Sequence, residues 1–204
     1  MKNKVLMGLA AIAMVAVLSS CGKKPQAEID ATNAAIEAAK TAEAAVYVPA
    51  ELKAVQDSMN VINADVAAQE SKFLFKKFGP AKVKLVSTLA LANKVAADAV
   101  AKKAEVKKEV ETELASIKTV IDENKTLLKK APRGKDEKAV LEQMATEITT
   151  IEASVVEAQG LYDKGTYMDA LNKIKAASSR ATGINTELKD AIAKVKGKAP
   201  AGRK

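Results

Sequence analysis

Apolar residues recur at intervals of three and four positions along most of this chain, the spacing that places them on one face of an α-helix. Glycine or proline interrupts the pattern at most of its joints. The pattern predicts five helices, over about residues 26–47, 49–77, 80–130, 136–163 and 166–196. We therefore predict an all-α protein.

The same spacing predicts which side chains are buried. In the first three segments we expect these residues to face the core: Ile29, Ile36, Ala39 and Val46; then Leu52, Val55, Met59, Ile62, Val66 and Phe73; then Val83, Val86, Ala90, Ala97 and Val100, followed by Val110, Leu114, Ile117, Ile121 and Leu128. The last two segments carry the same alternation, from Leu141 to Tyr162 and from Tyr167 to Val195. A lone stripe cannot bury itself, so neighbouring stripes should close on common cores.

The third segment is unusually long, because no helix breaker occurs between Pro80 and Lys130. If it is helical throughout, it extends roughly 75 Å. Its middle, Ala101 to Glu111, reads AKKAEVKKEVE and carries only a thin apolar stripe. This charged stretch is the expected junction between two parts of the protein.

A weak internal repeat supports a division into two units. KAVQDSM at Lys53 to Met59 aligns with KAVLEQM at Lys138 to Met144, and Gly79 then matches Gly165. We predict an elongated helical bundle of two three-helix units, residues 26–104 and 105–196, that share the long central helix, with a short linker at 21–25 and a flexible basic tail at 197–204. The alternative is one compact bundle in which the long helix breaks at the charged stretch, and solution scattering distinguishes the two.

The first twenty residues have the pattern of an export signal. Lys2 and Lys4 precede the apolar run from Val5 to Leu18, and small residues follow it. The run is too short for a permanent transmembrane helix, which needs about 20 residues. We predict that residues 1–20 are a cleaved signal peptide.

The only cysteine of the chain directly follows this signal. Leu18-Ser19-Ser20-Cys21 resembles the lipobox of bacterial lipoproteins. The resemblance implies a diacylglycerol on the Cys21 sulfur, cleavage before Cys21 and an acylated N-terminus, a membrane anchor of several acyl chains. Gly22 stands where an aspartate commonly retains such proteins in the inner membrane, so the periplasmic face of the outer membrane is the expected location.

Composition excludes some partners. The formal net charge is +8, or +6 without Lys2 and Lys4, but the lysines are spread along the chain. Three Tyr, three Phe and no Trp are too few for a base-stacking platform, so we expect no nucleic-acid partner. Lys23 and Lys24, next to the predicted anchor, are best placed to attract anionic lipid or cell-wall polymer.

The residue types of common active sites are missing. The chain has no histidine, its one thiol is assigned to the anchor, and it lacks a phosphate-binding glycine loop. Glu142, Glu147, Glu152 and Glu157 have a spacing of five, which carries them around a helix, so we interpret them as solvated charges rather than metal ligands. We expect neither an enzyme nor a cofactor.

Three further resemblances bear on partners. LYDKGTYMDALNKIKAA at Leu161 to Ala177 looks like the junction between two tetratricopeptide helices, which implies a peptide groove, but the 34-residue period is absent. We interpret its tyrosines as core and turn packing. The terminal Arg203-Lys204 resembles the end of the murein lipoprotein, which implies attachment of Lys204 to peptidoglycan.

Residues 25 to 100, with Tyr47-Val48-Pro49-Ala50-Glu51-Leu52, resemble a family of uncharacterised bacterial lipoproteins with a helical domain. This family brings no known activity. The expected function is a structural, scaffolding or envelope-interaction role, with peptidoglycan or envelope proteins as partners. The alternative is a chaperone-like module that binds a peptide or an amphiphile between its helices. The oligomeric state is left open by the sequence.

Overall fold

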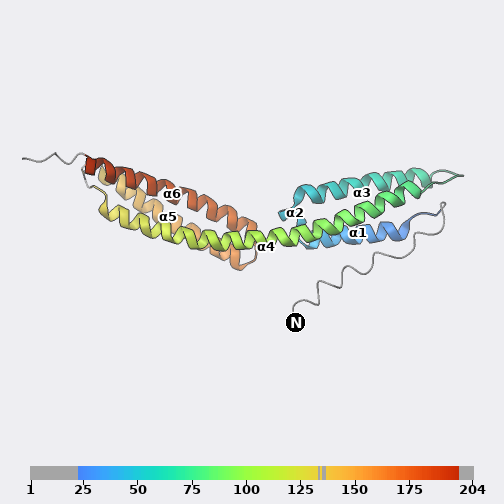
Figure 1. The fold of residues 1–204 in the computed structure, drawn as a ribbon, viewed down its shortest axis with the longest axis horizontal. Coiled ribbons are helices and arrows are strands. Elements are labelled where there is room, and N and C mark those ends of the chain that lie inside the picture. The colour runs from blue at the N-terminus through green and yellow to red at the C-terminus, as the bar shows by residue number, and fades with distance from the viewer. Residues whose placement is uncertain (1–22, 133, 135–136, 198–204) are drawn as a thin grey trace, which may run out of the picture. The chain divides into compact units, whose positions relative to one another are not determined.

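The computed structural model describes residues 23–132, 134 and 137–197, with side chains up to Lys194. All regular secondary structure in these residues is helical (Figure 1). The helices are α1 (Gln26–Thr41), α2 (Ala44–Tyr47), α3 (Pro49–Glu70), α4 (Gly79–Lys130), α5 (Glu137–Asp163) and α6 (Tyr167–Gly197). The predicted all-α class is confirmed.

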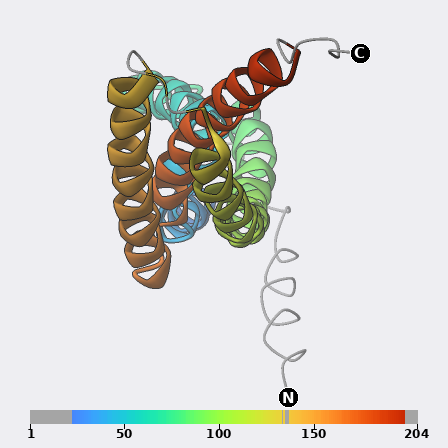
Figure 2. The ribbon, with the colours of Figure 1, turned by 90° about the vertical axis from the view of Figure 1, so that its left-hand side faces the viewer.

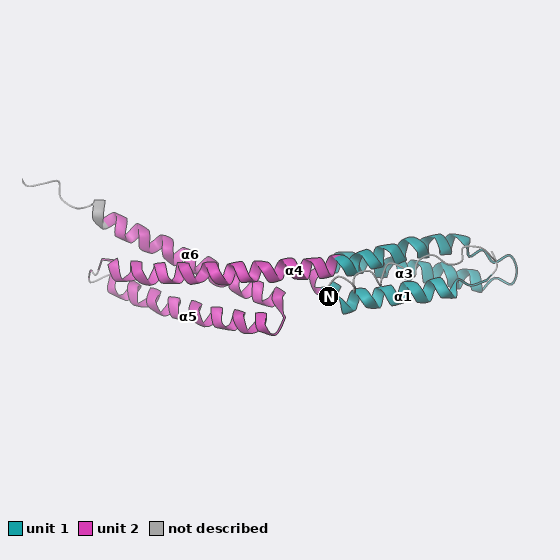
Figure 3. Cartoon of the chain, turned by 60° about the horizontal axis from the view of Figure 1, so that its bottom comes forward, with its two compact units in different colours: residues 1–45, 49–97 teal, residues 46–48, 98–204 magenta. Residues whose placement is uncertain are grey.

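The helices divide into two compact units that share α4 (Figure 3). Unit 1 contains residues up to 45 and residues 49–97, and unit 2 contains residues 46–48 and those from 98 onward. The boundary between the units falls between Ala97 and Asp98 of α4, whereas the sequence predicts it between residues 104 and 105.

Helix α4 runs without a break through the charged stretch, so the alternative with a broken central helix is wrong. Val106 and Val110 of this stretch are buried in the core of unit 2. Lys102 pairs with Glu105 one turn further along, at 2.9 Å. The stretch therefore keeps both the buried stripe and the local charge pairing that a continuous helix needs.

In the first half of α4 the predicted core face is wrong. Val83, Val86, Ala90, Ala97 and Val100 are all exposed. The buried residues instead follow one another at intervals of four and three: Ala81, Leu85, Thr88, Ala92, Val95 and Ala99. They share unit 1 with alanine-rich α1, whose buried face includes Ala35 and Ala39. The predicted and the observed sets both recur at intervals of three and four, so spacing alone does not select between the two faces, and packing within unit 1 buries the face that carries Leu85 and Val95.

The first two predicted helices are each shorter than expected. Glu43 adopts a left-handed backbone (φ 62°), which ends the first helix at Thr41 and separates it from α2, and Val46 is exposed. The second helix ends at Glu70 instead of residue 77. Phe73 lies in the loop that follows and is exposed rather than buried. The remaining predicted core residues of α1 and α3 are buried.

Unit 2 is built as the pattern predicts. Helices α5 and α6 lie side by side with the second half of α4 (Figure 2). Their stripes share one hydrophobic core, which contains Val110, Leu114, Ile117 and Ile121 of α4, Ile148, Ile151, Val155 and Ala158 of α5, and Ala170, Leu171, Ile174, Ala177, Ala181, Ile184 and Leu188 of α6. The predicted core of this half is confirmed for these residues, whereas Leu128, Leu141, Met144, Tyr162 and Tyr167 are only partly buried against it and the side chain of Val195 lies outside the described ones.

Two asparagines interrupt the apolar core of unit 2. Asn124 of α4 is fully buried, and its side-chain amide donates a hydrogen bond to the Ala181 carbonyl of α6 at 2.7 Å. The side-chain amide of Asn185 donates in turn to the side-chain oxygen of Asn124 at 2.8 Å. The sequence pattern did not identify this pair, because an asparagine within an apolar stripe reads as a polar interruption.

The turn between α5 and α6 lies at Lys164 and Gly165, as predicted. The Gly165 amide donates to the Tyr162 carbonyl at 2.9 Å, and the Thr166 amide donates to the Leu161 carbonyl at 3.1 Å. With Gly165 at φ 81°, these bonds form a Schellman motif, which ends a helix at a left-handed residue. The motif holds Tyr162 and Tyr167 at neighbouring helix ends.

We expect Gly165→Ala to destabilise unit 2 by about 1–2 kcal/mol, because a Cβ disfavours the left-handed backbone. The matched control is Gly183→Ala in α6, where an added Cβ likewise meets nothing within 4 Å. That change should stabilise the helix by about 0.8–1 kcal/mol. Urea unfolding measures both, and equal signs for the two variants would contradict the expectation.

Candidate functional site

The three tyrosines of the chain, Tyr47, Tyr162 and Tyr167, all lie in unit 2, and we call them the tyrosine cluster. The rings of Tyr162 and Tyr167 are tilted by 50°, with their centroids 5.3 Å apart. This is an ordinary distance for a packed aromatic pair. Tyr47 is buried, and the other two are half-buried. The interpretation of Tyr162 and Tyr167 as core and turn packing is confirmed.

Two lysines of α4 lie over these rings. The Lys103 ammonium is 6.0 Å from the ring centroid of Tyr47 and 5.9 Å from that of Tyr167. The Lys107 ammonium, one helical turn further, is 5.9 Å from the ring centroid of Tyr162 and 5.8 Å from that of Tyr167. A cation within about 6 Å of a ring centroid is attracted to the negative face of the ring. Each lysine therefore bridges two tyrosines.

Glu111 completes this face of α4 one turn beyond Lys107. The Tyr162 hydroxyl donates a hydrogen bond to its carboxylate. This bond, followed by burial and the negative charge of Glu111, raises the pKa of Tyr162 to about 12. The phenol is therefore held neutral at physiological pH and is a poor nucleophile or base. The cluster fastens the α5–α6 turn to α4, and its chemistry is structural.

The sequence interpretation missed this site. Lys103, Lys107 and Glu111 belong to the charged stretch that the sequence identifies only as a junction, and nothing in the sequence connects Tyr47 with the tyrosines 115 and 120 positions later. One signal was present: the three charged residues are spaced by four, which puts them on one helix face. Their partners come from distant segments, so only the tertiary structure identifies them.

The raised pKa of Tyr162 has a measurable consequence. Because the folded protein raises it from 10.0 to about 12, the stabilisation from the Tyr162–Glu111 bond is complete below about pH 10 and is lost as the pH rises toward 12. In an alkaline titration of tyrosinate absorbance, the component that Tyr162→Phe removes should have its midpoint near pH 12. Circular dichroism on the same samples verifies that the helices persist. If the component that Tyr162→Phe removes is instead centred near pH 10, the assignment of the raised pKa to Tyr162 is wrong.

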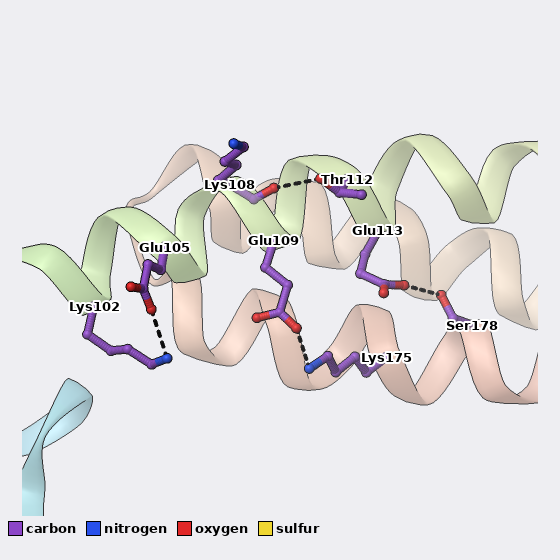
Figure 4. Close-up of polar contacts among 8 residues, drawn as sticks. All are labelled: Lys102, Glu105, Lys108, Glu109, Thr112, Glu113, Lys175 and Ser178. Atoms are coloured by element: carbon purple, nitrogen blue, oxygen red, sulfur yellow. Dashed lines mark hydrogen bonds and ion pairs between the residues drawn. The ribbon is translucent and has the colours of Figure 1, made fainter.

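A second feature is an open hollow of about 310 Å³ on α4, lined by Glu105, Lys108, Glu109, Thr112 and Glu113 (Figure 4). Each of its carboxylates already has a partner. Glu105 pairs with Lys102, Glu109 pairs with Lys175 of α6 at 2.5 Å, and Glu113 accepts a hydrogen bond from Ser178 at 3.1 Å. The hydrogen bond that Lys102 donates to Glu105 also raises the pKa of Lys102. The three carboxylates of the hollow are therefore engaged by neighbouring side chains, and the described residues include no cluster of three or more metal-ligating side chains.

Four of the five glutamates of α5, those at positions 142, 147, 152 and 157, do not form a common site. Each pairs with a different basic residue: Glu142 with Lys138, Glu147 with Arg180, Glu152 with Lys125 and Glu157 with Lys173. These side chains are exposed or partly exposed, and each is held in an ion pair at the surface. Three of the pairs connect α5 to α4 or α6, and surface pairs of this kind each contribute about 0–1 kcal/mol.

The two site residues predicted from the sequence, Cys21 and Lys204, lie outside the described residues, as does the predicted signal peptide. Their lipidation and peptidoglycan attachment stay predictions. Among the described helices, none has the length and apolar character of a membrane span. Comparison of the chain with protein-family models, with curated proteins and with solved structures gave no match.

Proposed function

We propose that this protein is an outer-membrane lipoprotein, held at the periplasmic face by acyl chains on Cys21, whose helical units serve a structural or envelope-interaction role. The sequence basis is the lipobox-like segment that ends at Cys21. The proposed role is not catalytic.

The core of unit 2 is the observation that carries the structural role. The apolar stripes of α4, α5 and α6 pack against one another, and their largest apolar residues face inward. The outer surface connects the helices through ion pairs such as Lys125–Glu152 at 2.6 Å and Lys189–Glu123 at 2.9 Å. A body of this kind suits contact through its polar exterior better than enclosure of an apolar ligand.

The anchor is tested in cells that carry the full chain. In the wild type, we expect the protein in the outer-membrane fraction, with intact mass showing cleavage before Cys21 and added acyl chains. Cys21→Ala should abolish both acylation and lipoprotein-type cleavage. Gly22→Asp is the matched control, since it should keep acylation but move the protein to the inner membrane. An unmodified Cys21, or a chain that retains Met1, would reject the proposal.

Partners are tested by crosslinking in live cells followed by pull-down. A structural role predicts specific envelope components in the wild-type sample and their loss in the Cys21→Ala variant, which is no longer placed at the outer membrane. If no envelope component is captured from the acylated wild type, the interaction role is rejected, even if the acylation of Cys21 is demonstrated.

A further inference from the structure

The loop between α3 and α4 presents three consecutive large apolar residues to solvent. Phe73 is 95% exposed, Leu74 63% and Phe75 86%, and we call them the Phe-Leu-Phe segment. Phe78, three residues later, is buried in contrast. Single exposed apolar residues are common on protein surfaces, whereas a contiguous group of this kind indicates a surface that meets another phase or partner.

Local contacts close the base of this loop. The side-chain oxygen of Gln69 accepts a hydrogen bond from the Lys77 amide at 3.0 Å and another from the Lys72 ammonium at 3.1 Å. Gln69 therefore joins the two ends of the loop, while Phe78 anchors its far end in the core. The Phe-Leu-Phe segment lies at the tip.

The charge around the tip has one sign. Lys72 precedes the Phe-Leu-Phe segment, Lys76 and Lys77 follow it, and residues 71–78 contain no acidic residue. Within the described part of the chain, no carboxylate pairs with Lys72, Lys76 or Lys77. Apolar side chains framed by lysines match an anionic lipid surface, in which the apolar groups enter the acyl boundary and the ammonium groups meet phosphates.

The loop also lies beside the start of the described chain. The Lys24 ammonium is 3.2 Å from the carboxylate of Glu70, the last residue of α3 before the loop. Both residues belong to unit 1. Cys21 is three residues before Lys24, a distance that the chain spans in at most about 11 Å. Acyl chains on Cys21 would thus hold the base of this loop close to the membrane.

We propose that the Phe-Leu-Phe segment inserts into an anionic lipid surface, as a second membrane contact beside the acylated Cys21, with Lys72, Lys76 and Lys77 at the lipid phosphates. The location of this contact rests on the proposed lipoprotein function. A protein partner is the less suitable occupant, since the tip is only three side chains wide and its charged rim has a single sign. The second contact would fix the orientation of unit 1 on the membrane, which a flexible acyl anchor alone does not.

The absence of tryptophan from the chain makes the test direct. Phe75→Trp introduces a single reporter into the loop, and Val61→Trp, at a 56% exposed position of α3 in unit 1, is the matched control. The full chain is reconstituted into vesicles of phosphatidylethanolamine and phosphatidylglycerol. We expect the Phe75→Trp emission to shift to the blue, to be quenched by lipids brominated on their acyl chains and to be shielded from iodide. The Val61→Trp emission should remain that of tryptophan in water.

Equal iodide quenching of the two reporters would overturn the proposal, and a reporter that is shielded only when envelope proteins are added would assign the loop to a protein partner instead. Adding Lys72→Gln, Lys76→Gln and Lys77→Gln to the Phe75→Trp chain should weaken the shift, as should vesicles of phosphatidylcholine alone. An unchanged shift in both would reject the role of anionic lipid.

Intact mass on the same samples separates this proposal from the lipoprotein function. If Cys21 is acylated but the Phe75→Trp side chain remains in water, membrane insertion of the loop is rejected and the lipoprotein function is not. Insertion by a chain whose Cys21 is unmodified would reject the lipoprotein function alone.

Discussion

Replacing Ile174 by Ala should lower the free energy of unfolding of unit 2 by about 2–5 kcal/mol. Ile174 of α6 is fully buried in the core that α4, α5 and α6 share. Its truncation removes apolar contacts and leaves a cavity that the tightly packed helices fill only in part. Because the total stability of a domain is about 5–15 kcal/mol, this one change is a large fraction of it.

Tyrosine fluorescence measures this effect in the unit where it occurs. All three tyrosines lie in unit 2, and the three phenylalanines lie in unit 1. Urea unfolding followed by tyrosine emission therefore reports on unit 2, while circular dichroism reports on both units. The control is Val156→Ala on α5, at a position 72% exposed, where we expect a change within about 0.5 kcal/mol. Similar losses in the two variants would contradict the core assignment.

Asn124→Ala should destabilise unit 2 by about 1–3 kcal/mol, although it replaces a polar residue in a hydrophobic core. The change removes the hydrogen bond to the Ala181 carbonyl and takes one acceptor, the Asn124 side-chain oxygen, from the side-chain amide of Asn185, which keeps its hydrogen bond to Glu123. The variant loses two buried hydrogen bonds and leaves one N–H of the Asn185 amide without an acceptor, so its cost exceeds the net value of one bond.

A double-mutant cycle with Asn185→Ala isolates the asparagine pair. Both single variants break the same hydrogen bond. The sum of their two losses in unfolding free energy should therefore exceed the loss in the double variant by about 0.5–3 kcal/mol. Tyrosine emission in urea again provides the measurement. Additive costs would show that the two asparagines act independently. Asn185 also lowers the pKa of Glu123, although the hydrogen bond from Lys189 has the larger effect there.

The buried pair has a role that an apolar residue could not fill. Leucine at position 124 would continue the stripe of Ile117, Ile121 and Leu128, but such a stripe packs almost equally well after a one-turn shift between helices. A hydrogen bond from Asn124 to one particular carbonyl selects a single register of α4 against α6. We therefore expect the buried asparagine to specify the alignment of α4 with α6.

Sequence reasoning predicted unit 2 better than unit 1, and particular residues show why. In α5 and α6 the large apolar residues, such as Ile151 and Ile174, are also the buried ones, so hydrophobicity alone finds the core. In the first half of α4, Val83 and Val86 are more apolar than Ala81 and Thr88, yet the valines face solvent. Two faces of this half of α4 carry apolar residues at helical spacing, and only its packing within unit 1 decides which of the two is buried.

Some helix ends can be predicted from the sequence, whereas others are known only from the structure. Gly165 is readable as a turn because glycine populates the left-handed backbone at low cost. Glu43 and Phe75 adopt the same backbone region without any such signal, and they end α1 early and shape the loop after α3. Neither residue type favours this backbone, so the sequence predicts continuous helices through both positions.

By itself, the sequence determined the helical class, the repeated three-helix pattern, the long uninterrupted α4 and the expectation of an anchor at Cys21, because these depend on residue spacing and local chemistry. Only the tertiary structure decided which face of α4 is buried in unit 1, which charged residues meet the tyrosine cluster, and that Lys24 lies beside the loop carrying Phe73 and Phe75. These features depend on distances between segments far apart in the chain, and packing sets such distances.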